Sequence, residues 1–390
     1  MMKNKPILSL VVALAAVQTL HAERNLGLGV DAYASLKPVV DGVLQKGAPA
    51  IAFSPFSFEL ACCSFAEAFD SIGRADIAEN MGVLTDFDSV YRPLVEKFLS
   101  PEANAATNGF SMLAARALCL PDVFQANVEY RKRINEMNGT AVCLDHPPTG
   151  AESWFKAMMD AQMEDFAYPV SLRHDPSLYR FIDAVVVRAT VGVGTGAQLK
   201  AVGFAPEDAK ISVVPFLRFP ATVSYCRNER GFTVRVPLAE NTFLYILTPL
   251  KGKSLASLEA SVKGENIREI IAGVESVTEK DCGSVDGVVE LPAMDFTSIV
   301  DTDAAFTVAK IPTSGFVHID SSLAKRESFQ YTRFILEGAP AEPAEDGKSA
   351  KKRQANDKGQ RRFVFNRPFL FFIYNREADL IPVIGRFTGK

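Results

Sequence analysis

The C-terminal stretch, residues 363–390, reads FVFNRPFLFFIYNREADLIPVIGRFTGK. It contains two runs of aromatic and aliphatic residues of the kind that form buried strands, joined by the polar turn Asn375-Arg376-Glu377. The preceding segment, 338–362, is instead rich in Ala, Glu, Pro, Gly and Lys, which form no core. The sequence therefore predicts a buried terminal hairpin preceded by an exposed loop.

A second informative stretch, Ala52-Phe53-Ser54-Pro55-Phe56-Ser57-Phe58, joins a short apolar strand to a helix. Ser54 is a suitable N-cap, and Pro55 suits the first helical position because its missing N–H is not needed there. The helix that follows, 56–69, is apolar on nearly every face and is therefore expected inside the protein.

The order of predicted elements indicates the fold class, because helices come mostly first and strands mostly last. The expected helices are 33–44, 56–69, 74–81, 90–99, 122–137, 151–166 and 254–271, and the expected strands are 50–53, 110–120, 141–144, 179–190, a meander over 211–247, 288–296, 318–321 and 329–336. A strand, a helix and a strand over 110–144 favour parallel pairing. This pattern predicts an α+β fold with large mixed or antiparallel sheets.

Composition and the N-terminus predict an exported protein. The 390 residues are 48% hydrophobic, and the net charge of −4 gives no general attraction to nucleic acid. Residues 1–22 have the basic, apolar and small-residue regions of a cleaved secretory signal. Their apolar run is shorter than the roughly 20 residues of a membrane span, and no later stretch is long enough. We expect a soluble, secreted monomer with one domain, 23–390.

The six cysteines are too few for a disulfide scaffold and lack the spacing of a metal site. Cys119 and Cys143 are the favoured bridge, because each ends a predicted strand on either side of a helix and export brings an oxidising compartment. We expect no cofactor and no metal.

Several segments resemble the serpin family of protease inhibitors. These are 52–58, Asn108-Gly109-Phe110, Val289-Glu290-Leu291-Pro292 and, most specifically, Asn366-Arg367-Pro368-Phe369-Leu370 with the terminal hairpin. The similarity runs from about residue 28 to the end. It implies a serpin-like fold, with about eight or nine helices around a large mixed sheet and two smaller antiparallel sheets, and an exposed reactive-centre loop at 338–362.

The resemblance also implies a mechanical function without catalysis. A target protease cleaves the loop, which then inserts as a new strand in the main sheet and traps the attached protease. Counting from Glu337, and backward from 366–369, places the cleaved bond near Arg353, with Lys352 and Gln354 beside it. A basic residue there implies a serine-type, trypsin-like endopeptidase as partner.

The hinge departs from the family pattern of small residues. It consists of Glu337, Gly338, Ala339, Pro340 and Pro343 with intervening residues, and each proline lacks the N–H that a central strand must donate. Glu342, Glu345 and Asp346 add a cost wherever they are buried. A slow hinge turns an inhibitor into a substrate, so the alternative function is a non-inhibitory binding or scaffold protein.

Other residues match the family's sheet-opening region. Ser54 and Ser57 match the serines beneath the opening of the main sheet, whereas Asp183 stands in place of Asn and Phe329 in place of a gating His. In the third strand of that sheet, Arg188-Ala189 replaces Lys-Gly. These replacements imply altered timing of sheet opening rather than another fold.

Two further interpretations concern the basic loop and the histidines. Lys348, Lys351, Lys352, Arg353, Lys358, Arg361 and Arg362 can serve as protease bait, as an anchor for a polyanion, or only to keep the loop solvated. A hydrolase is disfavoured, because His146, His174 and His318 are the only histidines left after the signal and no Gly-x-Ser-x-Gly or His-Glu-x-x-His motif occurs.

Overall fold

The computed structural model describes residues 26–40, 43–44, 50–82, 87–100, 109–120, 126–136, 139–143, 159, 178–207, 210–276, 281–319, 322–340 and 360–389. The signal-like segment 1–22 lies outside these residues, as does loop segment 341–359, and only Met159 is described of the helix expected at 151–166.

The main sheet contains strands from distant parts of the chain. Its order is β2 (Val43–Leu44), β1 (Lys37–Val40), β12 (Met294–Asp301), β13 (Lys325–Gly338), β6 (Leu178–Val191), β4 (Phe110–Leu120) and β5 (Gly139–Cys143). The pairs β13–β6 and β4–β5 are parallel and the others antiparallel, so the expected mixed sheet and the parallel pairing over 110–144 are confirmed.

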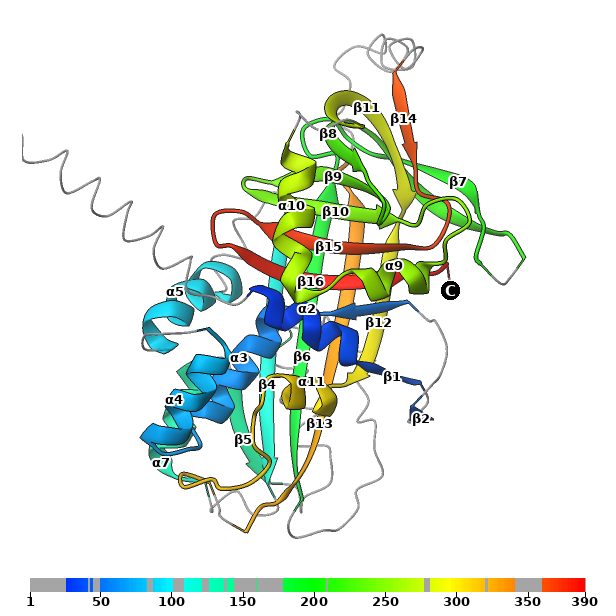
Figure 1. Ribbon diagram of the computed structural model, residues 1–390. Coiled ribbons are helices and arrows are strands. Elements are labelled where there is room, and N and C mark those ends of the chain that lie inside the picture. Colours follow the sequence, from blue (N-terminus) through cyan, green and yellow to red (C-terminus); the bar gives the residue numbers. More distant parts are fainter. Residues whose placement is uncertain are drawn as a thin grey trace, which may run out of the picture.

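The second sheet forms the upper part of Figure 1. Its order is β14 (Arg361–Val364), β11 (Cys282–Pro292), β8 (Ser212–Arg227), β9 (Phe232–Ala239), β10 (Thr242–Thr248), β15 (Phe369–Asn375), β16 (Leu380–Phe387) and β3 (Ile51–Phe53), and β7 (Gln198–Phe204) also pairs with β8. The two smaller sheets that the family resemblance implies are continuous here, because strand β8 bonds both β11 and β9. The predicted terminal hairpin is β15–β16, and every residue of β15 is buried.

The helices cover the lower part of the molecule and one face of the second sheet (Figure 1). They are α2 (Leu26–Ser35), α3 (Pro55–Ala66), α4 (Ser71–Asn80), α5 (Phe87–Leu99), α7 (Val128–Glu136), α9 (Leu255–Ser261), the short 3-10 helix η2 (Gly264–Asn266), α10 (Ile267–Glu275) and α11 (Asp303–Val308). Helix α3 is buried along its whole length, and Ser54 caps it by accepting a bond from the Ser57 N–H at 3.1 Å. Both expectations for this helix are confirmed.

Three predicted elements were wrong. The helix expected over 33–44 ends at Ser35, and strands β1 and β2 follow as a small hairpin, because the β-branched Val39, Val40 and Val43 pair well in strands. The helix expected over 254–271 is divided into α9, η2 and α10. In the segment expected as a strand over 318–321, His318 and Ile319 form none, and the His318 N–H instead donates to the Ala68 carbonyl.

The sequence did not identify the disulfide that the structure contains. Cys226, in β8, and Cys282, in β11, occupy facing positions of an antiparallel pair, and their sulfur atoms are 2.04 Å apart. Cys119 lies opposite Val142 in the sheet register rather than opposite Cys143, so this register gives no support to the expected Cys119–Cys143 bridge. The side chain of Cys143 is outside the described part of the structure.

Candidate functional site

The candidate site begins at the seam between β6 and β13, the two strands that flank the hinge. They pair in parallel along their whole length, from Lys325 opposite Leu178 to Gly338 opposite Val191. Just beyond the strand, the Ala339 N–H donates to the Val191 carbonyl at 2.8 Å, and the Ala339 carbonyl accepts from the Ala197 N–H at 3.0 Å. The seam is therefore closed, with no strand between β6 and β13.

An ion pair crosses the upper end of this seam. Arg188 of β6 donates to both carboxylate oxygens of Glu337 in β13 at 3.2 Å, and the two side chains are 41% and 43% exposed. Pro340, the first residue after the last hydrogen-bonded one, is exposed. The structure thus brings Glu337, Gly338, Ala339 and Pro340 together at the top of the seam, while Pro343 lies outside the described residues.

A buried polar network lies beneath the middle of the same seam. Asp183 of β6 accepts from the Ser57 hydroxyl at 2.7 Å and from the Gln330 amide of β13 at 2.8 Å. Gln330 also accepts from the Ser54 backbone N–H at 2.6 Å. The start of helix α3 is therefore hydrogen-bonded to both strands, which stabilises the closed seam.

The charge of Asp183 is balanced by one cation. Arg116 of β4 places its Nε 3.7 Å from Asp183 Oδ1 and donates to the Ser57 hydroxyl at 3.0 Å, and both charged side chains are almost fully buried. Burial raises the pKa of the Asp183 carboxyl above its ordinary value, although Arg116 and the hydrogen bonds from Ser57 and Gln330 act in the opposite direction. Burial likewise lowers the pKa of Arg116.

The structure brings the predicted residues Ser54, Ser57 and Asp183 together. It adds Arg116 and Gln330, which the sequence did not indicate. Arg116 is a charged interruption in the otherwise apolar strand β4, and such an interruption usually marks a buried polar contact. Gln330 gives no comparable signal, because β13 contains many other polar residues. Phe329 is in the seam, opposite Ile182 in β6, but its side chain packs on the other face of the sheet among apolar residues. It takes no part in the network around Asp183.

The far end of the loop is attached through β14. This short strand pairs in parallel with β11, and Arg362 donates to the buried carboxylate of Glu290 at 2.7 Å, while Arg218 lies 3.6 Å from the same carboxylate. Phe363 is buried next to Tyr225 and Phe232. Both ends of the loop are thus fixed, while Lys352, Arg353 and Gln354 lie outside the described residues.

Comparison with known proteins agrees with this architecture. The profile of the family "Serpin (serine protease inhibitor)" matches residues 42–389, so the chain belongs to the serpin family, whose members are protease inhibitors rather than catalysts as a rule. No curated protein matches the sequence.

Solved structures with the same fold are distant in sequence. Native protease nexin-1 with heparin superposes with a TM-score of 0.73 at 14% identity, over 96% of this chain and 100% of that one. Uncleaved ovalbumin gives 0.69 at 15% identity, over 87% and 93%, and serpin-12 of Manduca sexta gives 0.68 at 12% identity, over 93% and 98%. At such identities the likeness confirms the fold alone.

No helix among the described residues is long and apolar enough to cross a membrane. Within the same residues, no group of three or more His, Cys, Asp or Glu side chains is placed to hold a metal ion.

Proposed function

We propose that the protein is a secreted inhibitor of a trypsin-like serine endopeptidase and acts as a suicide substrate. The target cleaves after Arg353 or Lys352, and the freed loop inserts between β6 and β13. The observation that supports this proposal is the closed parallel seam with a loop fixed at both of its ends. A strand that enters from Ala339 would run antiparallel to both neighbours, and antiparallel pairs are slightly more stable per residue than parallel ones.

The hinge decides between inhibition and simple cleavage. Ala339 is already bonded to Val191 and Ala197, so Pro340 is the first residue that has to enter the seam. Pro340 and Pro343 cannot donate to a neighbouring strand, and each lost bond costs about 1 kcal/mol, more where the opposing carbonyl is buried dry. This specific feature favours the second candidate function, a non-inhibitory binding or scaffold protein with an intact serpin fold.

Export rests on two observations. Residues 1–22 have the composition of a cleaved signal, and the Cys226–Cys282 disulfide is of the kind that persists in oxidising compartments. We place the mature protein at 23–390, as a single-domain monomer whose partner is its target protease.

The test mixes the mature protein with trypsin and separates the products on a denaturing gel. A complex that survives denaturation, together with a large rise in melting temperature after loop cleavage, supports suicide inhibition. The matched variant Arg353→Gln, combined with Lys352→Gln, should abolish the complex and the cleavage at this bond, while trypsin can still cut after Lys348, Lys351 or Lys358. Clean cleavage without complex and without added thermal stability would establish the non-inhibitory alternative.

A further inference from the structure

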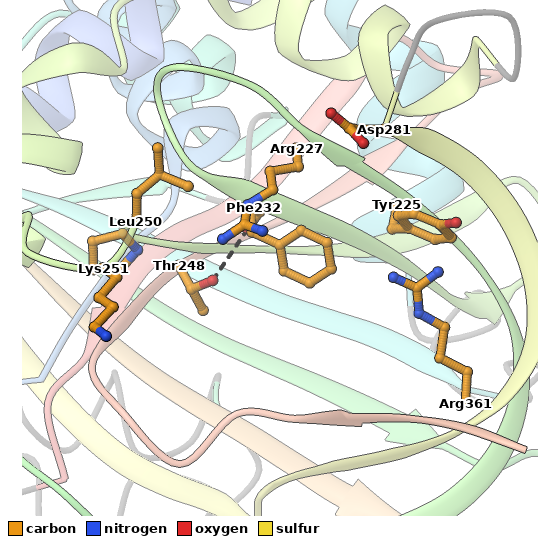
Figure 2. A pocket seen from close by; sticks show the side chains of 9 residues that line it. Tyr225, Arg227, Phe232, Thr248, Leu250, Lys251, Asp281 and Arg361 are labelled. Carbon is orange, nitrogen blue, oxygen red and sulfur yellow. Dashed lines mark hydrogen bonds between the residues drawn. The ribbon is translucent and has the colours of Figure 1, made fainter.

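A polar cavity lies beside the far attachment of the loop (Figure 2). Its volume is about 520 Å³, and it is lined by residues of β8, β9 and β14, of the end of β10 and the segment after it, and of the position before β11: Tyr225, Arg227, Phe232, Thr248, Pro249, Leu250, Lys251, Asp281 and Arg361. Cavities of this size hold small organic ligands in other proteins. Of its lining residues, Arg361 alone belongs to the segment 338–362, and none belongs to the network around Asp183.

The lining carries three cations and one carboxylate. Arg227, Lys251 and Arg361 all reach the cavity, whereas Asp281 is the single acidic residue in its wall. Among the residues that the structure describes, no ion pair engages any of these three cations. Three positive charges against one carboxylate leave the cavity with a net positive charge, which attracts an anion.

Two aromatic rings, Tyr225 and Phe232, form part of the cavity wall, and Tyr225 orients one of the cations. The guanidinium carbon of Arg361 lies 4.1 Å from the centre of the Tyr225 ring and 5.4 Å from that of Phe363. Tyr225 and Phe232 have ring centres 6.2 Å apart. A guanidinium stacked on a ring keeps its N–H groups available at the edge, and this planar fork suits the oxygen atoms of a sulfate or phosphate.

A disulfide bond and the pairing of β8 with β11 hold the cavity wall in place. The Cys226–Cys282 disulfide joins β8 to β11, and its two cysteines are the chain neighbours of Tyr225, Arg227 and Asp281. The Arg227 N–H also donates to the Asp281 carbonyl at 3.1 Å. Such a rigid wall is a feature of preformed ligand sites, because little ordering is then needed on binding.

We propose that this cavity binds a small ligand that carries a sulfate or phosphate group on a sugar ring. Because Lys251 and Arg361 lie on opposite sides of the cavity (Figure 2), the guanidinium groups of Arg227 and Arg361 bind the oxyanion and the ammonium of Lys251 donates to another oxygen of the ligand. The ring lies against Phe232, because Arg361 covers the face of Tyr225. Because Arg361 opens β14, a bound ligand links the far end of the loop to the body of the second sheet. Binding therefore protects β14 against opening, and it requires no inhibitory activity.

The experiment titrates the intact protein, by calorimetry at fixed ionic strength, with two charged probes. One probe is a sulfated uronic acid–glucosamine disaccharide and the other is fructose 1,6-bisphosphate, with the unsulfated disaccharide, which keeps only its carboxylate, as the control. Lys251→Gln, Arg227→Gln and Arg361→Gln should each weaken binding about fivefold to tenfold, since one charge-assisted hydrogen bond is lost. Lys200→Gln, an equal charge change at an exposed position of β7, should leave affinity unchanged.

A second measurement follows hydrogen exchange of the amides at 361–364, which should slow when the preferred probe is bound. Tighter binding of the disaccharide identifies a sulfated sugar as the source of the oxyanion, and tighter binding of the bisphosphate identifies a phosphorylated one. The proposal is overturned if neither probe binds more tightly than the unsulfated control, or if all three cavity variants bind like the wild type. It is equally overturned if affinity falls only in a variant that replaces Lys351, Lys352 and Arg353 by Gln, because the loop would then be the binding site.

Discussion

The middle and the upper end of the β6–β13 seam are held together in different ways. In the middle, the buried Asp183 is bonded to Ser57 and Gln330 and balanced by Arg116. At the upper end, the half-exposed Arg188–Glu337 pair lies in contact with water. Removing one partner of a buried pair is costly, whereas exposed pairs contribute little, so the seam is weakest next to the hinge. Opening is therefore expected to begin where a loop can enter.

The largest expected effect is that of Arg116→Leu. It leaves the Asp183 carboxylate buried without its cation, and the free energy of unfolding should fall by about 3–5 kcal/mol. Equilibrium unfolding in urea at neutral pH measures this loss. Arg188→Leu, a matched change on the same sheet, should cost less than about 1 kcal/mol. Equal losses in the two variants would contradict the contrast between the middle and the end of the seam.

Replacing the hinge prolines should have the next largest effect. Pro340→Thr with Pro343→Ala restores two backbone donors, each worth about 1 kcal/mol in a strand ladder. The loop-cleaved variant should therefore melt at a higher temperature than the loop-cleaved wild type, and more of the protease should be trapped as complex. Melting of the two intact proteins is the control and should not differ. If cleaved variant and cleaved wild type melt alike, the prolines do not limit insertion.

The sequence predicted the strands and the helix at the seam better than it predicted the polar contacts between them. The strands that carry Asp183 and Phe329 and the buried helix after Ser54 followed from apolar patterning, which depends on local periodicity. The partnership of Asp183 with Arg116 and Gln330 did not, because it joins three strands that are distant in the chain. Phe329 was grouped with the sheet-opening residues by position along the chain, yet alternation in β13 directs it to the opposite face from Gln330.

The disulfide is a second example of a contact between distant parts of the chain that the sequence did not predict. Cys226 and Cys282 are 56 residues apart, and only the antiparallel register of β8 and β11 makes them neighbours. Adjacency to predicted strands favoured Cys119 and Cys143 instead, although parallel pairing sets Cys119 opposite Val142. Register depends on the whole sheet and cannot be read from one strand and its flanking residues.

The raised pKa of Asp183 predicts that the free energy of unfolding depends on pH, with an effect smaller than those of Arg116→Leu and of the proline replacements. A carboxyl whose pKa is higher in the folded state binds its proton more readily there than in the unfolded chain. This site therefore contributes more to stability as the pH falls through the folded-state pKa, and less as the pH rises. Unfolding midpoints of wild type and Asp183→Asn, measured from neutral pH down to about pH 4, should diverge in favour of the wild type on acidification. A constant difference would show that this carboxyl has an ordinary pKa.

The smallest effect concerns the exposed pair at the top of the seam. Glu337→Gln and Arg188→Gln should each change the free energy of unfolding by less than about 1 kcal/mol, and their coupling in a double-mutant cycle should shrink as salt is added. Their effect on the rate of loop insertion after cleavage should be easier to detect, because the pair joins β6 to β13 where the hinge enters. Insertion should be faster in both single variants and no faster still in the double variant. This result would show that the ion pair between Arg188 and Glu337 slows the separation of β6 from β13. Unchanged insertion rates would mean that the network around Asp183 alone sets the timing of opening.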